Sequence, residues 1–246
     1  MKNKKLWFED WFDSPYYHVL YGNRDQDEAA HFIDNLLNYL RPKPEAHFLD
    51  LACGKGRHAL EIANKGFTTT GIDLSENSID EAKTIDHELL SFHVGDMRHV
   101  HFPNQFDYIF NLFTSFGYFD TSEGQKETLQ SIHKQLKNNG LLVIDYLNVS
   151  KAEALIAANP TQQMRIDGID FKTRKRVSNQ FISKEIDVTD GMDEHTFFEH
   201  VWRLHLHDFE KLLSNSGFQI QTIFGDYELN NFSAPTSDRL ILVAKK

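Results

Sequence analysis

The sequence predicts an α/β fold whose core is a doubly wound, mostly parallel sheet. Over the first 150 residues, short apolar runs alternate with segments of helical periodicity, which is the pattern of parallel strands joined by crossover helices. One apolar run, His47–Leu51, leads straight into a glycine turn at Ala52–Gly56, and a helical pattern follows the turn. With 40% hydrophobic residues among 246, the chain has enough apolar side chains to fill one such core.

The elements of the first 150 residues are predicted from their periodicity and their end signals. Asp25 and Glu28 form a capping-box pattern at the start of a helix that extends to Leu40, and Arg41–Pro44 ends it. The elements that follow are expected to be a strand at 47–51, a helix at 57–65 closed by Gly66, a Thr-rich strand at 67–73, a helix capped by Ser75, strands at 90–94 and 106–112, a helix at 122–137 followed by Gly140, and a strand at 141–147. The last strand, LLVIDYL, is nearly continuous in apolar residues, as in strands buried on both faces.

The pattern changes after residue 150. Ser150–Asn159 is predicted to be helical, with Ser150 and Glu153 as its capping box. Gln163–His207 has the alternation of strands and is interrupted at two Asp-Gly pairs, at 167–168 and 190–191, which are typical of hairpin turns. The closing elements are expected to be a helix at 208–215 followed by Gly217, and strands at 218–224 and 240–244. A small antiparallel β insertion is therefore predicted within the α/β fold.

Three parts follow from these elements. An N-terminal helical cap is expected at 1–45, and a ligand-binding domain is formed by 46–150 together with 208–246. The inserted helix and antiparallel ribbon at 151–207 are expected to cover the ligand site.

Composition excludes several classes of protein. The net charge of −10 disfavours a nucleic-acid binder, and Lys172–Arg176 is a local basic run typical of a solvated strand face. The single cysteine, Cys53, cannot form an internal disulfide or a multi-thiolate cluster. The N-terminus mixes Lys with Glu9 and Asp10, unlike a signal peptide, and no run approaches the roughly 20 apolar residues of a membrane helix. We therefore expect a cytoplasmic protein without a membrane association.

The glycine turn is compatible with more than one ligand. It lacks the P-loop pattern, but Gly54, Gly56 and Ala59 match the weak G-x-G-x-x-A pattern of dinucleotide sites. Asp73 ends the next strand, where a carboxylate accepts hydrogen bonds from ribose hydroxyls. Dinucleotides and smaller adenosine cofactors both satisfy this much.

Polar side chains also follow the neighbouring strands. Asp50 precedes the turn, Gly95–Met97 follows the third strand, and Asn111–Phe113 follows the fourth. In an open parallel sheet these positions meet at the edge where ligands bind. The sequence therefore predicts one site at this edge.

At this point the chain resembles the class I S-adenosylmethionine-dependent methyltransferases. The segments LDLACGKG, GIDLS, VGDM, FDYIFNLF and LKNNGLLVIDYLN occur in the order and spacing of that family, over residues 46–148. The resemblance implies a Rossmann-like sheet of seven strands with the last strand antiparallel, and S-adenosylmethionine as cofactor.

The resemblance also implies the cofactor contacts. Asp73 would hold the ribose hydroxyls, Asp96 would meet the adenine edge, and Arg24 would pair with the cofactor carboxylate. The full set implied for the cofactor is Tyr16, Tyr21, Arg24, Asp50, Ala52, Cys53, Gly54, Gly56, Asp73, Leu74, Ser75, Gly95, Asp96, Met97, Asn111 and Leu112.

The acceptor is expected to be a small molecule. The Asn-Pro-Pro-Tyr motif of many base and amide methyltransferases is replaced by NLFTSFGY, which makes a nucleic-acid base a less favoured acceptor. The substrate walls are predicted from Phe113, Phe116, Tyr118, Tyr146, Asn148 and Trp202. No catalytic residue is assigned, with His205 and Tyr146 as the candidate bases, and no metal is predicted because His205 and His207 lack a third ligand. The acceptor atom and the oligomeric state stay open.

Two alternatives remain at this stage. A nicotinamide-dependent oxidoreductase is supported by Gly54, Gly56 and Ala59, but a Tyr-x-x-x-Lys hydride-transfer pattern is not evident. A non-catalytic, cofactor-binding partner protein would retain the same turn and Asp73.

Overall fold

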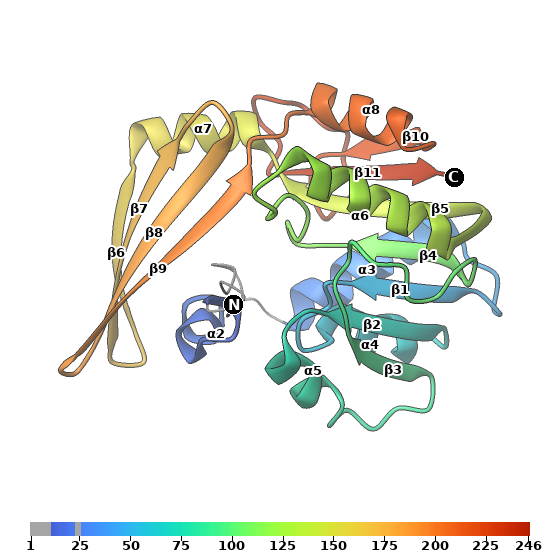
Figure 1. Cartoon of the computed structure of the whole chain (residues 1–246), viewed down its shortest axis with the longest axis horizontal. Helices are drawn as coiled ribbons and strands as arrows, with labels where there is room; N and C mark the ends of the chain where they lie inside the picture. Colours follow the sequence, from blue (N-terminus) through green and yellow to red (C-terminus); the bar gives the residue numbers. More distant parts are fainter. Residues whose placement is uncertain (1–10, 23–25) are drawn as a thin grey trace, which may run out of the picture.

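Two β-sheets organise the chain in the computed structural model, which describes residues 11–22 and 26–246 (Figure 1). The larger sheet has the order β10-β11-β5-β4-β1-β2-β3. Its strands are β1 His47–Leu51, β2 Thr68–Asp73, β3 Leu90–Val94, β4 Phe106–Asn111, β5 Leu136–Leu147, β10 Gln219–Phe224 and β11 Arg239–Lys245. The first five strands run parallel, and β11 is antiparallel to both β5 and β10. The predicted seven-stranded sheet with a reversed last strand is confirmed.

Helices cover both faces of this sheet because its strands are apolar on both sides. Leu49 of β1 faces a core cluster that includes α6 Ser122–Gln135 and α8 Leu206–Asn215. Phe48, the preceding residue, faces the cluster formed with α3 Gln26–Leu40 and α4 Arg57–Asn64. The short helix α5 Glu76–Ala82 packs beside β3, with Ser75 as the cap that the sequence predicts.

The second sheet is antiparallel throughout and has the order β6-β7-β8-β9. Its strands are β6 Thr161–Ile166, β7 Ile169–Val177, β8 Phe181–Asp190 and β9 Asp193–Trp202, and α7 Val149–Ala158 leads into it. Asp167 and Gly168 take left-handed conformations in the first hairpin turn, and Gly191 does so in the last, as Asp-Gly pairs allow. The antiparallel insertion is thus present as predicted.

The N-terminal helix α2, Pro15–Leu20, packs on the antiparallel sheet. Trp11 and Leu20 share a buried cluster with Phe171, Ile186 and Val188 of β7 and β8. Figure 1 shows α2 between this sheet and the α5 side of the larger sheet.

Two predicted boundaries are wrong. The helix predicted to reach residue 137 ends at Gln135, because residues 136–140 already belong to β5. The strand predicted to reach His207 ends at Trp202, because His205 and Asp208 form a capping box that starts α8.

One predicted helix cap is wrong, and another lies outside the described residues. Asn148, not Ser150, is the N-cap residue of α7, and Glu153 instead pairs with Arg203 of the segment after β9. Asp25 lies outside the described residues, so its predicted capping box has no structural account.

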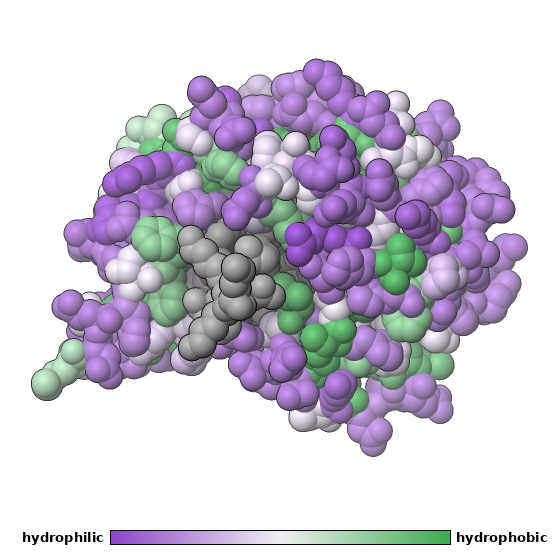
Figure 2. Space-filling view, in the orientation of Figure 1, coloured by the Kyte–Doolittle hydropathy of each residue, from purple (hydrophilic) through white to green (hydrophobic). Residues whose placement is uncertain are grey.

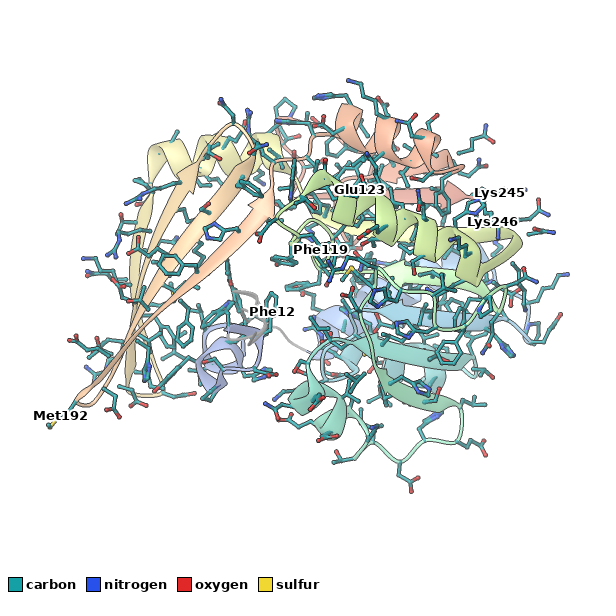
Figure 3. The ribbon with its side chains drawn as sticks, in the orientation of Figure 1. Phe12, Phe119, Glu123, Met192, Lys245 and Lys246 are labelled. Atoms are coloured by element: carbon teal, nitrogen blue, oxygen red, sulfur yellow. The ribbon has the colours of Figure 1, made fainter. Side chains whose placement is uncertain are left out.

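The surface seen in Figure 2 is mostly hydrophilic, with only scattered apolar side chains. Met192, labelled in Figure 3, projects from the tip of the β8–β9 hairpin and is 99% exposed. Across residues 11–22 and 26–246, none of the helices combines the length and the apolar character needed to cross a membrane.

Candidate active site

A cavity of about 350 Å³ lies at the carboxyl ends of the parallel strands. Its wall is formed by Phe12, Tyr17, His18, Tyr21, Gly22, Asp50, Ala52, Cys53, Gly54, Lys55, Arg57, His58, Asp73, Leu74, Ser78, Gly95, Asp96, Met97, Leu112, Phe113, Ser115, Tyr118 and Phe119. In Figure 3, Phe12 and Phe119 lie between the antiparallel sheet and this edge of the larger sheet. The cavity is therefore bounded by both the sheet edge and the N-terminal segment.

The glycine turn forms the floor beneath this edge. Ala52, Gly54 and Gly56 all have left-handed backbone, with φ of 64°, 53° and 82°. A Cβ placed on Gly54 would meet no atom within 4 Å, so the backbone is open toward the cavity at that point. Asp73 fixes the turn, since its Oδ2 accepts the Gly54 N–H at 2.8 Å while its Oδ1 accepts the Ser75 N–H at 2.9 Å.

Asp50 is the most perturbed carboxyl group of the site. It is 1% exposed, and one of its oxygens, Oδ2, lacks a hydrogen-bond partner among the described residues. Burial, reinforced by the nearby charge of Asp73, raises the pKa of Asp50 to about 7. Burial also raises the pKa of Asp73, although the N–H groups of Ser75 and Gly54 oppose the shift. Because Asp50 and Asp73 are buried near each other, the charge of Asp73 disfavours ionisation of Asp50. The cavity beside them has room for a cationic ligand.

The raised pKa of Asp50 predicts a pH-dependent stability. Because the folded carboxyl holds its proton up to about pH 7 and the unfolded one loses it near 3.8, the free energy of unfolding should fall as the pH rises through this interval. One group contributes at most about 1.4 kcal/mol per pH unit. Urea unfolding of the ligand-free protein should therefore show a steeper decline for wild type than for Asp50→Asn, and parallel curves would contradict the shift.

Asp96 is held by a neighbour that the sequence analysis missed. Arg98 donates from its backbone N–H at 2.9 Å and from its guanidinium to both carboxylate oxygens, and the same guanidinium lies 4.4 Å from the ring centre of Phe119. Burial acts to raise the pKa of Asp96, but the pairing with Arg98 outweighs this effect and holds the pKa below its usual value. A charged carboxylate therefore faces the cavity beside the apolar side chain of Met97.

The N-terminal segment forms the roof of the cavity, and the antiparallel sheet supports it. Glu199 of β9 accepts hydrogen bonds from the Trp11 indole at 2.7 Å and from the Tyr21 hydroxyl at 2.6 Å. Lys184 of β8 donates to the same Tyr21 hydroxyl at 2.6 Å and lies over its ring. We call residues 11–22 the roof segment.

A model of the methyltransferase domain matches residues 42–200, which is more than half of the chain. The chain belongs to the class I S-adenosylmethionine-dependent methyltransferase family. Neither the oxidoreductase nor the non-catalytic alternative receives support from this match.

Curated relatives and solved structures agree with the family. The protein named putative methyltransferase YqeM of Bacillus subtilis is 28% identical over 211 residues, which cover 82% of this chain and 85% of the relative. The dTDP-3-amino-3,4,6-trideoxy-alpha-D-glucopyranose N,N-dimethyltransferase of Streptomyces venezuelae is 30% identical over 131 residues, 52% of this chain and 54% of the relative. The crystal structure of an S-adenosylmethionine-dependent methyltransferase from Clostridium acetobutylicum superimposes with a TM-score of 0.77 at 19% identity, covering 94% of this chain and 95% of that one, which shows the shared fold.

The residues of the cavity fit S-adenosylmethionine. This cofactor carries a sulfonium, an amino group, ribose hydroxyls and an adenine amine, all of which favour carboxylate partners. Three carboxyl groups, Asp50, Asp73 and Asp96, line the cavity, and within residues 11–22 and 26–246 the Oδ2 atom of Asp50 has no hydrogen-bond partner. The open backbone at Gly54 leaves space for the ligand beside them.

Most of the predicted cofactor residues lie on the cavity wall of the methyltransferase. These are Tyr21, Asp50, Ala52, Cys53, Gly54, Asp73, Leu74, Gly95, Asp96, Met97 and Leu112. Burial raises the pKa of the Cys53 thiol well above its usual value, so this side chain is a poor nucleophile. Arg24 lies outside the described residues.

Four predicted cofactor residues do not line the cavity. The Tyr16 hydroxyl donates to Asp190 at 3.3 Å on the antiparallel sheet, and the Asn111 amide donates to the Leu51 carbonyl at 2.9 Å in the core. Ser75 is used to cap α5. Gly56 is the N-cap of α4, where it packs against Phe92.

The predicted acceptor walls are corrected further. Phe113 and Tyr118 line the cavity, but Phe116 packs in the core against Phe209. Tyr146 is fully buried and donates its hydroxyl to the Trp202 carbonyl, while the Trp202 indole donates to the Phe119 carbonyl. The Asn148 amide donates to the carbonyls of Ala234 and Ser237, each at 2.8 Å. Burial raises the pKa of Tyr146 well above its usual value, which removes it as a candidate base.

His205 is not in a position to act on a ligand in the cavity. It is the N-cap residue of α8 and its Nδ1 lies 3.3 Å from the Ser150 hydroxyl. His207 lies in the first turn of α8, and its ring stacks on that of His205 with a centroid distance of 5.7 Å. No group of three or more metal-ligating side chains occurs in the described part of the chain.

The roof contributes residues that the sequence analysis did not assign. Phe12, Tyr17 and His18 all line the cavity. A helical spacing rule could have found Tyr17, because residues four apart share a helix face, whereas Tyr16 and Tyr21 are five apart. Burial, with a smaller effect of Lys55, lowers the pKa of His18.

Proposed function

We propose that this protein transfers the methyl group of S-adenosylmethionine to a small-molecule acceptor that enters the aromatic side of the cavity. The carrying observation is that one cavity is lined by two chemically different kinds of side chain. Asp50, Asp73 and Asp96 supply carboxyl groups on the floor, whereas Phe12, Tyr17, Tyr118 and Phe119 supply rings from the roof and from the loop after β4.

The aromatic side chains of the lining favour an amine as acceptor. The rings of Tyr17 and Tyr118 both meet Phe12 edge to face, with centroid distances of 5.0 and 5.3 Å. Ring faces stabilise cations, and an amine that is methylated becomes cationic at nitrogen. The Streptomyces venezuelae relative, whose name describes an amino-sugar N,N-dimethyltransferase, supports the same class. We therefore propose a small amine as the acceptor.

The side chains act by alignment and by exclusion of water. S-adenosylmethionine supplies an electrophilic methyl group when bound, so the protein needs mainly to place a nucleophile in line with it. The roof segment covers the floor, and Tyr21 ties that segment to Glu199 of β9. Burial lowers the pKa of His18 and so favours its neutral imidazole, which can accept a hydrogen bond from an amine in the cavity.

Calorimetry followed by an acceptor screen tests the proposal. S-adenosylmethionine and S-adenosylhomocysteine are expected to bind, and NAD is not. Radiolabelled methyl transfer is then measured to small amines, among them glycine and a nucleotide-linked amino sugar, with total RNA as the comparison. Binding of NAD alone would overturn the cofactor, and transfer to RNA but to no small amine would overturn the acceptor class.

A further inference from the structure

The chain makes a strained turn directly after β4. Phe113 and Thr114 both have left-handed backbone, with φ of 62° and 60°. For residues with a Cβ this conformation is strained, because the Cβ comes too close to the backbone carbonyl. Neither residue is a glycine or an asparagine, so the turn depends on contacts from its surroundings.

Asp145 of β5 supplies those contacts. Its carboxylate Oδ2 accepts the N–H of Phe113 at 2.8 Å, and its backbone carbonyl accepts the N–H of Thr114 at 2.9 Å. Arg239 of β11 adds a third contact by donating from Nη2 to the Thr114 hydroxyl at 2.9 Å. Both strained residues are therefore held by groups on strands that are far away in sequence.

The carboxylate of Asp145 is itself fixed in place. It is fully buried, and Arg239 Nε donates to its Oδ1 at 2.6 Å. The Tyr227 hydroxyl donates to its Oδ2 at 3.2 Å. Burial first, and then the charge of Asp145, raises the pKa of Tyr227, which keeps the phenol protonated as a donor. We call Asp145, Arg239 and Tyr227 the turn-holding cluster.

Residues in and beside the turn line the cavity, whereas the turn-holding cluster does not. Leu112, Phe113 and Ser115 line the cavity, whereas none of the three cluster residues does. The Phe113 ring also lies near two guanidinium groups, at 5.6 Å from Arg57 and 5.8 Å from Arg239. The position of this part of the cavity wall therefore depends on the turn-holding cluster, which does not itself line the cavity.

We propose that Asp145, Arg239 and Tyr227 are positioning residues, which set the affinity for the cofactor by imposing the left-handed turn that places Leu112 and Phe113 on the cavity wall. The assignment rests on the proposed function, because it concerns the same cavity. It differs from a purely structural role, in which the buried pair would only join β5 to β11. A glycine in the turn distinguishes the positioning role from the structural role, since glycine adopts a left-handed conformation without strain. If the cluster acts by imposing the turn, such a glycine should restore affinity when the cluster is disrupted.

Calorimetry measures the affinity for S-adenosylhomocysteine of wild type and of three variants. These are Asp145→Asn, Asp145→Asn/Thr114→Gly and Asp107→Asn. Asp107 is a matched control, because its carboxylate also accepts one backbone N–H, from His47 at 2.9 Å, and one cation, from Lys137 at 2.8 Å. We expect Asp145→Asn to bind at least tenfold more weakly and Asp107→Asn to bind within twofold of wild type. The double variant Asp145→Asn/Thr114→Gly should bind at least threefold more tightly than Asp145→Asn alone.

The outcomes decide between the two roles. A tenfold loss without any recovery by Thr114→Gly, or an unchanged affinity in Asp145→Asn, would overturn the proposal. If Asp145→Asn does not fold, Arg239→Lys replaces it. That variant keeps the charge but loses the fork that reaches both Asp145 and Thr114, and at least a fivefold loss is expected.

Amide hydrogen exchange tests the positioning role independently of the proposed function. If wild type fails to bind S-adenosylhomocysteine, the proposed function fails, but residues 112–118 can still be followed in the ligand-free protein. Their amides should exchange at least tenfold faster in Asp145→Asn than in Asp107→Asn. Equal exchange in the two variants would overturn the positioning role.

Discussion

Replacing Asp73 by alanine is expected to weaken the binding of S-adenosylmethionine by at least a hundredfold. Its carboxylate ends β2 at the cavity, and hydrogen bonds from ribose hydroxyls to a charged group contribute about 1.5–3 kcal/mol each. Two such bonds correspond to a hundredfold or more in affinity. The variant also loses the contact that ties the Gly54 N–H to the floor of the site. Calorimetry measures the change.

Two further variants define the cause of that loss. Asp73→Asn keeps one acceptor oxygen and should fall between wild type and alanine. Asp80→Ala removes an exposed carboxyl group of α5 and should leave the affinity unchanged. An affinity of Asp73→Ala within threefold of wild type would contradict the assigned role.

Gly56→Ala is expected to lower the free energy of unfolding by about 2–5 kcal/mol. The residue has a φ of 82°, and a Cβ there would lie 2.5 Å from Cζ of the buried Phe92. Left-handed strain contributes roughly 1–2 kcal/mol and overpacking roughly 1–3 kcal/mol. Urea unfolding gives the difference.

Gly54→Ala is the matched control for this substitution. Its φ of 53° imposes strain, but its Cβ would meet nothing within 4 Å, so a loss of only the roughly 1–2 kcal/mol of left-handed strain is expected. Since Gly54 lines the cavity, this variant should instead impair cofactor binding. Combining Gly56→Ala with Phe92→Leu should destabilise less than the sum of the single changes. Equal losses in the two glycine variants would show that Phe92 does not restrict the turn.

The sheet and the floor of the site were predictable because local signals determine them. Buried strands such as β1 and β5 are apolar on both faces, and the residues that follow parallel strands must meet at one edge. Asp73 and Asp96 could therefore be assigned to the site from their positions alone. The start of α8 was missed because a histidine, His205, takes the place of the usual cap residue.

The acceptor side was less predictable because it depends on contacts between distant segments. Tyr146 and Trp202 were candidates for the wall, but they bond to each other and to the Phe119 carbonyl behind it. Phe119 itself gave no signal in the sequence, since its place on the wall follows from that tertiary contact. The strained turn at Phe113 was equally invisible, because its cause is a carboxylate on another strand.

The support of the roof has a consequence for how the chain matures on the ribosome. Tyr21 and its acceptor Glu199 are 178 positions apart, so the roof segment cannot complete its contacts with the antiparallel sheet until β9 has been synthesised. At about 5–20 residues per second, the synthesis of these 178 residues lasts roughly 9 to 36 seconds. During this time Trp11 and Leu20 lack the β7 and β8 side chains that bury them in the finished protein. The burial of Trp11 and Leu20 by β7 and β8 can therefore be completed only late in synthesis.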